Sequence, residues 1–177
     1  LKDKYPGCEV TVLAEKRNGA VFSFCSHVRR TYRYDKLREL FSTLCGSYDV
    51  VVDTEQWHFL SALTARLTGS SMIIGFATNE RTRMFTHSVP YSHETYEVLS
   101  FFSLLKPLGF IGDFSYLPPF LDVPGNAIAS AAAKLGDFSG RRYITIFPGA
   151  SIPERRWGVE RFRELASRLH GRGFAIV

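Results

Sequence analysis

The residues between Ile144 and Trp157 combine a strand, a turn of small residues and two guanidinium groups. A β-branched run ends at Phe147, and Pro148-Gly-Ala-Ser151 follows it directly. Arg155-Arg156-Trp157 are then predicted to open an amphipathic helix. Small residues at Gly149, Ala150 and Ser151 would let a ligand approach the backbone, whose N–H groups can donate to phosphate oxygens. Arginine forks would neutralise the charge. The pattern predicts a phosphate site; the alternative is an ordinary strand-to-helix turn with solvated arginines.

Two carboxylates follow the predicted buried strand Tyr48–Asp53. A carboxylate at a strand end can take a proton from an acceptor hydroxyl, as glycosyl transfer requires. For Asp53 we favour a different role, capping the N–H groups of the following helix. The role of Glu55 remains undecided, and it is a weak candidate for the general base.

A polar loop, Thr78-Asn-Glu-Arg-Thr-Arg83, follows the next predicted strand at 71–75. Arg81 and Arg83 are spaced to reach one anion, and ligands of open α/β sheets bind outside the carboxyl ends of the strands. A solvated surface loop is the alternative. His93 could contribute to the same site or simply begin a long helix.

Strands and helices alternate along the chain, which predicts an open, doubly wound parallel sheet. A region rich in Pro and Gly at 110–125 suits a linker between a first domain, 1–122, and a second, 123–177. The expected strands are 9–14, 48–53, 71–75, 144–147 and the start of one at 173–177; the expected helices are 37–44, 60–67, 93–108, 127–135 and 162–171.

Composition excludes several classes of protein. Hydrophobic content of 45% with 22% charged residues indicates a globular chain rather than a disordered one. No apolar run reaches the ~18–20 residues that span a bilayer. Cysteines and histidines show no metal-ligand spacing, so no metal site is expected. The net charge of +5 suits an anionic partner, but nucleic acid is the least favoured, because no recognition motif accompanies the charge.

Several short motifs, in this order and spacing, resemble glycosyltransferase family 9, the ADP-heptose:lipopolysaccharide heptosyltransferases. Each motif is degenerate alone, and their succession along most of the chain carries the resemblance. The matching segments are Tyr48-Asp-Val-Val-Val-Asp-Thr-Glu-Gln56, Ser61-Ala-Leu-Thr-Ala-Arg66 with Gly69, Ile74-Gly-Phe76, His93, Leu104-Leu-Lys-Pro-Leu-Gly109, and the Pro148–Ser151 turn with Arg155-Arg156-Trp157.

The resemblance implies a GT-B fold: an acceptor-side Rossmann-like domain at 1–122, lacking its first strand, and the start of a truncated nucleotide-sugar-binding domain at 123–177. Catalysis of this type needs neither metal nor cofactor, because cations of the protein stabilise the departing diphosphate. Arg155 stands where members usually carry Lys. The implied donor-binding residues are Gly149, Ala150, Ser151, Arg155 and Arg156, and the acceptor-binding residues are Arg81, Arg83 and His93.

The implied function is transfer of a sugar, expected to be heptose from an ADP-linked donor, to lipopolysaccharide or another surface glycan. An anionic glycolipid acceptor would place the protein in the cytoplasm, peripheral to the inner face of the bacterial inner membrane. The family's general base is expected before Leu1, and further donor-binding residues after Val177. We therefore expect this chain alone to be inactive. The alternative is a non-catalytic nucleotide- or glycan-binding module.

Overall fold

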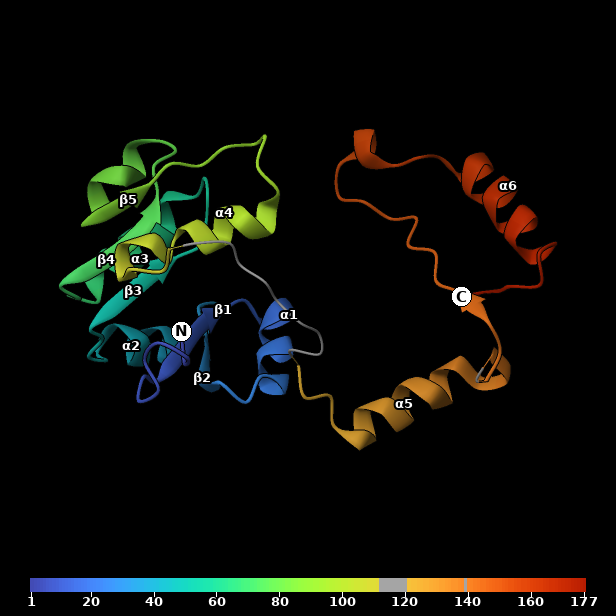
Figure 1. The fold of residues 1–177 in the computed structure, drawn as a ribbon, viewed down its shortest axis with the longest axis horizontal. Coiled ribbons are helices and arrows are strands. Elements are labelled where there is room, and N and C mark those ends of the chain that lie inside the picture. The colour runs from blue at the N-terminus through green and yellow to red at the C-terminus, as the bar shows by residue number, and fades with distance from the viewer. Residues whose placement is uncertain (112–120, 139) are drawn as a thin grey trace. The chain divides into compact units, whose positions relative to one another are not determined.

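The computed structural model describes residues 1–111, 121–138 and 140–177. The chain divides into two compact units, Leu1–Asp122 and Val123–Val177 (Figure 1). Most of the predicted linker at 110–125 lies outside the described residues. All strand pairs among those residues are parallel, as the alternation of strands and helices predicts.

The first unit contains two parallel sheets. Strands β1 (Val10–Ala14) and β2 (Val28–Arg33) form one, and β3 (Val50–Asp53), β4 (Met72–Phe76) and β5 (His87–Val89) form the other in the order β3-β4-β5. In this register Asp53 pairs with Gly75, and Gly75 with Ser88. The ends of the three strands therefore lie at one edge of the sheet.

Strand β4 is buried on both faces, as a central parallel strand should be. Side chains alternate between the faces of a strand. Ile74 and Phe76 pack with Val89 and Leu104 in the main apolar cluster, and Ile73 is also fully buried. The loop at 78–83 therefore follows the best-packed strand of the unit.

Helices α2 (Leu37–Leu44) and α3 (Phe59–Leu67) form where the apolar spacing predicts them. Gly69, at φ 71°, ends the turn after α3, a backbone conformation that favours glycine. The apolar face of α2 is only partly covered, because Leu37 and Phe41 are 75% and 64% exposed. Spacing therefore predicted the helices correctly, but not the burial of the α2 face.

The long helix predicted at 93–108 is wrong in its bounds. Helix α4 covers only Glu97–Ser103, and a separate 3-10 turn follows at Lys106–Leu108. Tyr96 has an extended ψ of 128°, so the backbone cannot continue a helix back to His93. His93 is left in a loop after β5.

Several elements with weak sequence signals were not predicted. They are β2, β5 and the helix α1 (Lys16–Gly19), together with 3-10 helices at Ala20–Phe24 and Glu80–Met84. Residues 78–83, expected as a loop, thus include most of a 3-10 helix whose first N–H groups are capped by Asn79, which accepts from the Arg81 N–H at 3.0 Å.

The second unit pairs β6 (Tyr143–Ile144) with β7 (Ala175–Ile176). Helix α5 (Gly125–Leu135) runs into a 3-10 turn at Gly136–Phe138, and α6 (Val159–His170) precedes β7. Strand β6 is shorter than the predicted 144–147. Within the described helices, none has the length and apolarity needed to cross a membrane.

An ion pair beside β2 gives the fold a testable dependence on pH. Glu39 accepts hydrogen bonds from the backbone N–H of Arg33 at 2.8 Å and from its guanidinium Nε at 3.0 Å. Hydrogen bonds from the Arg33 side chain lower the pKa of Glu39 from 4.5 to about 2.

Because the folded state binds this proton more weakly than the unfolded state, the stabilisation is present above pH ~4.5 and is lost toward pH ~2. Urea unfolding should show that the wild type has a higher free energy of unfolding than Glu39→Gln above pH ~4.5, and that this difference shrinks as the pH falls toward ~2. Glu9→Gln is the control, because its pair with Arg29 is 61% exposed on both sides and should contribute little. An advantage that stays constant down to pH ~2 would contradict this assignment.

Candidate functional site

Three loops converge at the carboxyl edge of the β3-β4-β5 sheet. The loop after β3 carries Glu55 and Trp57, the loop after β4 carries Asn79, and the loop after β5 carries His93. The Asn79 side-chain amide donates to the Trp57 carbonyl at 3.1 Å. The Trp57 indole stacks on the His93 ring, with centroids 5.7 Å apart and planes 11° apart. The structure therefore brings together the two loops that the sequence singled out, and adds a third.

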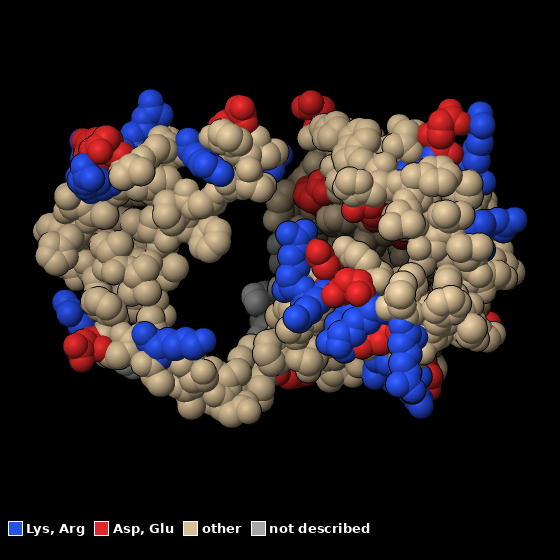
Figure 2. Space-filling view, turned by 180° about the vertical axis from the view of Figure 1, so that it is seen from behind, with Lys and Arg blue, Asp and Glu red and all other residues tan. Residues whose placement is uncertain are grey.

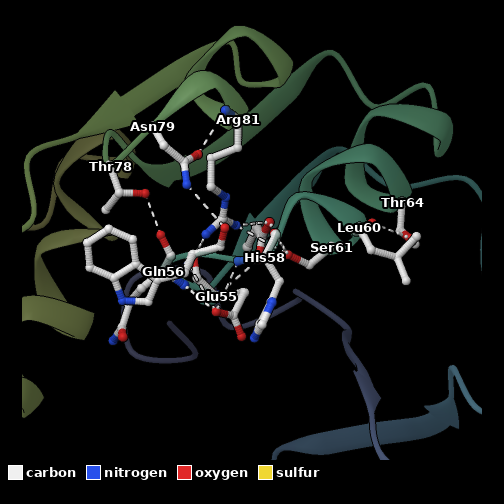
Figure 3. A network of polar contacts seen from close by, with 11 residues as sticks. Glu55, Gln56, His58, Leu60, Ser61, Thr64, Thr78, Asn79 and Arg81 are labelled. Atoms are coloured by element: carbon white, nitrogen blue, oxygen red, sulfur yellow. Dashed lines mark hydrogen bonds and ion pairs between the residues drawn. The ribbon is translucent and has the colours of Figure 1, made fainter.

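Arg81 lies at the centre of this convergence and is fully buried (Figure 3). Its guanidinium pairs with the Asp53 carboxylate at 2.5 Å, donates to Ser61 Oγ at 3.2 Å, and also donates to the Glu55 carbonyl. The side chains of Arg81 and Asp53 are 0% and 5% exposed. In this arrangement Arg81 holds the loops together, and its guanidinium is not open to an acceptor.

Asp53 does not cap helix α3. One of its carboxylate oxygens accepts from the Glu55 N–H at 2.9 Å, and the other serves Arg81 and Ser61. Asp53 takes this role because Arg81 is buried beside it, and a buried guanidinium is stable only when a carboxylate compensates its charge. The favoured reading of Asp53 as a helix cap is therefore replaced by a loop turn and a buried ion pair.

Glu55 accepts hydrogen bonds from the backbone N–H groups that precede α3. Its carboxylate accepts from the backbone of Gln56 and Trp57 at 3.0 Å each, and from His58 at 3.4 Å. Burial raises the pKa of Glu55, but these hydrogen bonds outweigh it, so that the pKa lies below its ordinary value. A carboxylate held in this way is a weaker proton acceptor than a free one, which argues against Glu55 as the general base.

Arg83 and His93 are exposed at this edge. Arg83 pairs with Glu80 at 3.0 Å, and both side chains are more than 70% exposed. His93 contacts Tyr91 edge-to-face at 5.0 Å, in addition to its stack on Trp57. Sequence reasoning did not single out Trp57. Its position four residues after the end of β3 was the available signal.

The Pro148–Ser151 turn lies in the second unit, beside the two arginines that the sequence pairs with it. Arg156 Nε donates to the Ala150 carbonyl at 2.9 Å, and Gly149, Ser151 and Arg155 are exposed. The prediction that Arg155-Arg156-Trp157 open the helix is wrong. Arg155 ends a 3-10 turn (Pro153–Arg155), Arg156 is extended, and Gly158 at φ 99° separates both from α6.

A groove of about 530 Å³ lies beside this turn within the second unit. Its volume falls in the range of small-molecule sites, roughly 300–1,000 Å³. Its wall is apolar apart from two guanidinium groups, an arrangement that suits a ligand with one flat apolar part and one anionic part. The lining residues are Ile146, Pro148, Arg156, Gly158, Val159, Phe162, Arg163, Ala166, Ile176 and Val177.

Over the face drawn in Figure 2, basic side chains are interspersed with acidic ones. This mixing does not form the basic stripe typical of nucleic-acid binding. Within residues 1–111, 121–138 and 140–177, no cluster of His, Cys, Asp and Glu could hold a metal ion.

Parallel strands joined by crossover helices form a Rossmann-like architecture, and the similarity to solved heptosyltransferases of GT-B fold confirms the predicted fold class. A family model for glycosyltransferase family 9 (heptosyltransferase) matches residues 37–177, well over half of the chain. The chain therefore belongs to this family. A search of curated proteins finds no match.

Solved structures show the same fold at low sequence identity. The ADP-heptose lipopolysaccharide heptosyltransferase II of E. coli matches with a TM-score of 0.73 at 19% identity, covering 99% of this chain and 56% of that one. A family 9 glycosyltransferase from Veillonella parvula matches at 0.76 and 15%, covering 99% and 54%. The E. coli heptosyltransferase WaaC, solved with ADP, matches at 0.67 and 18%, covering 99% and 57%. The chain thus spans little more than half the length of these proteins.

Proposed function

We propose that this chain is part of a glycosyltransferase that moves heptose from an ADP-linked donor to lipopolysaccharide or another surface glycan. The observation that carries the proposal is the exposed Pro148–Ser151 turn with Arg155 and Arg156, inside the family-matched region. Similar structures support it, because WaaC was solved with ADP and with ADP-2-deoxy-2-fluoro heptose.

In the proposed reaction the acceptor hydroxyl attacks the anomeric carbon as the bond to the diphosphate breaks, and its proton passes to a general base, a role that neither Asp53 nor Glu55 is free to fill. Negative charge then develops on the leaving diphosphate, where N–H groups of the turn and the Arg155 guanidinium would stabilise it. Arg156 would hold the turn through its bond to the Ala150 carbonyl. With these cations in place, the proposed transfer is metal-independent.

The proposed acceptor is an anionic glycolipid, met at the carboxyl edge of the β3-β4-β5 sheet. Of the acceptor residues inferred from the resemblance, Arg83 and His93 are exposed there. A basic protein can attach weakly to an anionic membrane surface. The proposed location is therefore the cytoplasm, at the inner face of the bacterial inner membrane.

Titration of the 177-residue chain with ADP tests the donor site. Arg155→Ala should weaken ADP binding by about tenfold or more, because a charge-assisted hydrogen bond contributes roughly 1.5–3 kcal/mol. Arg155→Lys should recover part of the affinity, since it keeps the charge but not the fork. Arg168→Ala is the matched control: this exposed arginine of α6 pairs with Glu164 and lies outside the turn.

Equal ADP affinity in Arg155→Ala and Arg168→Ala would contradict the donor site. A DNA duplex that binds more tightly than ADP would contradict the choice of ligand class. Calorimetric titration of each variant gives both affinities directly.

The second candidate function is a non-catalytic nucleotide- or glycan-binding module. The observation that favours it is that both carboxylates of the β3 loop are engaged, Asp53 by Arg81 and Glu55 by backbone N–H groups. We therefore expect the 177-residue chain to bind donor without transferring sugar. Release of ADP from ADP-heptose in the presence of a glycan acceptor would overturn that expectation.

A further inference from the structure

Trp57 presents a large aromatic surface at the carboxyl edge of the first unit. Its side chain is among the exposed large hydrophobic groups, with 50% of the residue accessible. Exposing an indole is costly, because it leaves a large apolar area in water. Contacts with Glu55, Asn79 and His93 hold Trp57 in this exposed position.

Trp57 is fixed through its backbone and through one face of its ring. Its backbone N–H donates to Glu55 at 3.0 Å, and its carbonyl accepts from Asn79 at 3.1 Å. One ring face rests on His93, whose ring is in turn held edge-on by Tyr91 at 5.0 Å. The indole is therefore a preorganised plate, so that binding would require little further ordering.

A carboxylate is linked to the Trp57–His93 stack through Gln56 and Tyr91. Glu97 receives the Tyr91 hydroxyl at 2.9 Å and also the Gln56 side-chain amide. The hydrogen bond to Glu97 raises the pKa of Tyr91, so this hydroxyl stays protonated as a donor. A carboxylate offers about four acceptor sites, and the two bonds leave capacity for further donors. Gln56 precedes Trp57 directly, and Tyr91 contacts both Glu97 and His93, so Glu97 is joined to the residues on either side of the stack.

We propose that Trp57 is the stacking platform for a sugar ring of the acceptor glycan, with Glu97 accepting that ring's hydroxyl groups and His93 supporting the indole from behind. The C–H groups on one face of a pyranose are weakly positive and suit the negative face of an aromatic ring. The hydroxyl groups around the ring are donors that suit a carboxylate. The anionic Glu97 disfavours a phosphate in the same place, which favours a sugar over a nucleotide.

This inference rests on the proposed function, because it names the part of the acceptor that the first unit holds. It assigns His93 a positioning role and adds Trp57 and Glu97 as binding residues. The stack and the carboxylate both belong to the first unit.

The chain contains only two tryptophans, so Trp157→Phe leaves Trp57 as a single fluorescent reporter. We expect a saturable change in Trp57 emission when this variant is titrated with deacylated lipopolysaccharide core oligosaccharide. By calorimetry, Trp57→Ala should weaken binding of the same oligosaccharide by about five- to tenfold, and Trp57→Phe by less, since a smaller ring still stacks. Glu97→Gln should also weaken it.

Tyr34→Ala is the matched control, because Tyr34 is 46% exposed in the same unit and lies outside the three loops. Circular dichroism verifies that each variant is folded. Unchanged oligosaccharide affinity in folded Trp57→Ala, or no emission change at saturation, would overturn the proposal. So would a Trp57 response to ADP that exceeds the response to the oligosaccharide.

The same titrations separate this proposal from the donor site. Binding of ADP that depends on Arg155, with no binding of oligosaccharide, would contradict the stacking platform and support the donor site. Binding of oligosaccharide that depends on Trp57, with no binding of ADP, would support the stacking platform and contradict the donor site.

Discussion

Replacing Arg81 with methionine should lower the free energy of unfolding of the first unit by about 3–5 kcal/mol. That is the typical cost of removing one partner of a buried ion pair, since the other charge is left without compensation. Here the remaining charge would be Asp53, whose side chain is only 5% exposed. Such a loss is a large part of the roughly 5–15 kcal/mol that stabilises an ordinary domain.

Arg83→Met is the control for this prediction. Arg83 belongs to the same 3-10 helix, but its pair with Glu80 is exposed and should contribute less than about 1 kcal/mol. Urea unfolding of the Trp157→Phe background measures both changes through Trp57, which the same network holds. If the two variants lose similar stability, the buried pair is not the link between the loops.

The double replacement Asp53→Leu with Arg81→Met adds a second test. Removing both charges together should cost less than removing Arg81 alone, because no unpaired charge remains. A double variant that is as unstable as the sum of the single variants would show that the two side chains act independently.

The second large effect is expected at Gly75, the residue before the last one of β4. A Cβ at this position would lie within 2.6 Å of three ring atoms of Phe85. The Phe85 ring would have to move, and Arg81 lies over that ring at 5.4 Å. Overpacking of this kind costs typically about 1–3 kcal/mol. Gly75→Ala should therefore destabilise the unit by that amount.

Gly7→Ala is the matched control, because a Cβ at Gly7 would meet nothing within 4 Å. Its unfolding free energy should stay within about 0.5 kcal/mol of wild type. Adding Phe85→Leu to Gly75→Ala should restore part of the loss by making room. If Phe85→Leu and Gly75→Ala are simply additive, the clash with Phe85 is not the cause.

Local patterns in the sequence were sufficient for the parallel α/β class and for several elements. Apolar spacing predicted α2, α3 and α6, because a helix must place one stripe against its neighbours. The run at 48–53 predicted β3, because strands buried on both faces are continuously apolar. The order and spacing of several degenerate motifs indicated the family. Strand β2 is largely polar and β5 has only three residues, so neither carries such a pattern and neither was predicted.

Only the tertiary structure decided what the polar residues do. The sequence placed Asp53, Glu55 and Arg81 near the edge of one sheet. The two carboxylates could each cap a helix or accept a proton, and Arg81 could bind an anion or lie in solvent. Parallel pairing aligned the ends of β3 and β4, and this alignment buried Arg81 against Asp53 and left Glu55 to the N–H groups before α3. Trp57 and His93 are 36 positions apart, and no local pattern encodes their stack. Burial and pairing depend on contacts between distant segments, and these arise only when the sheet forms.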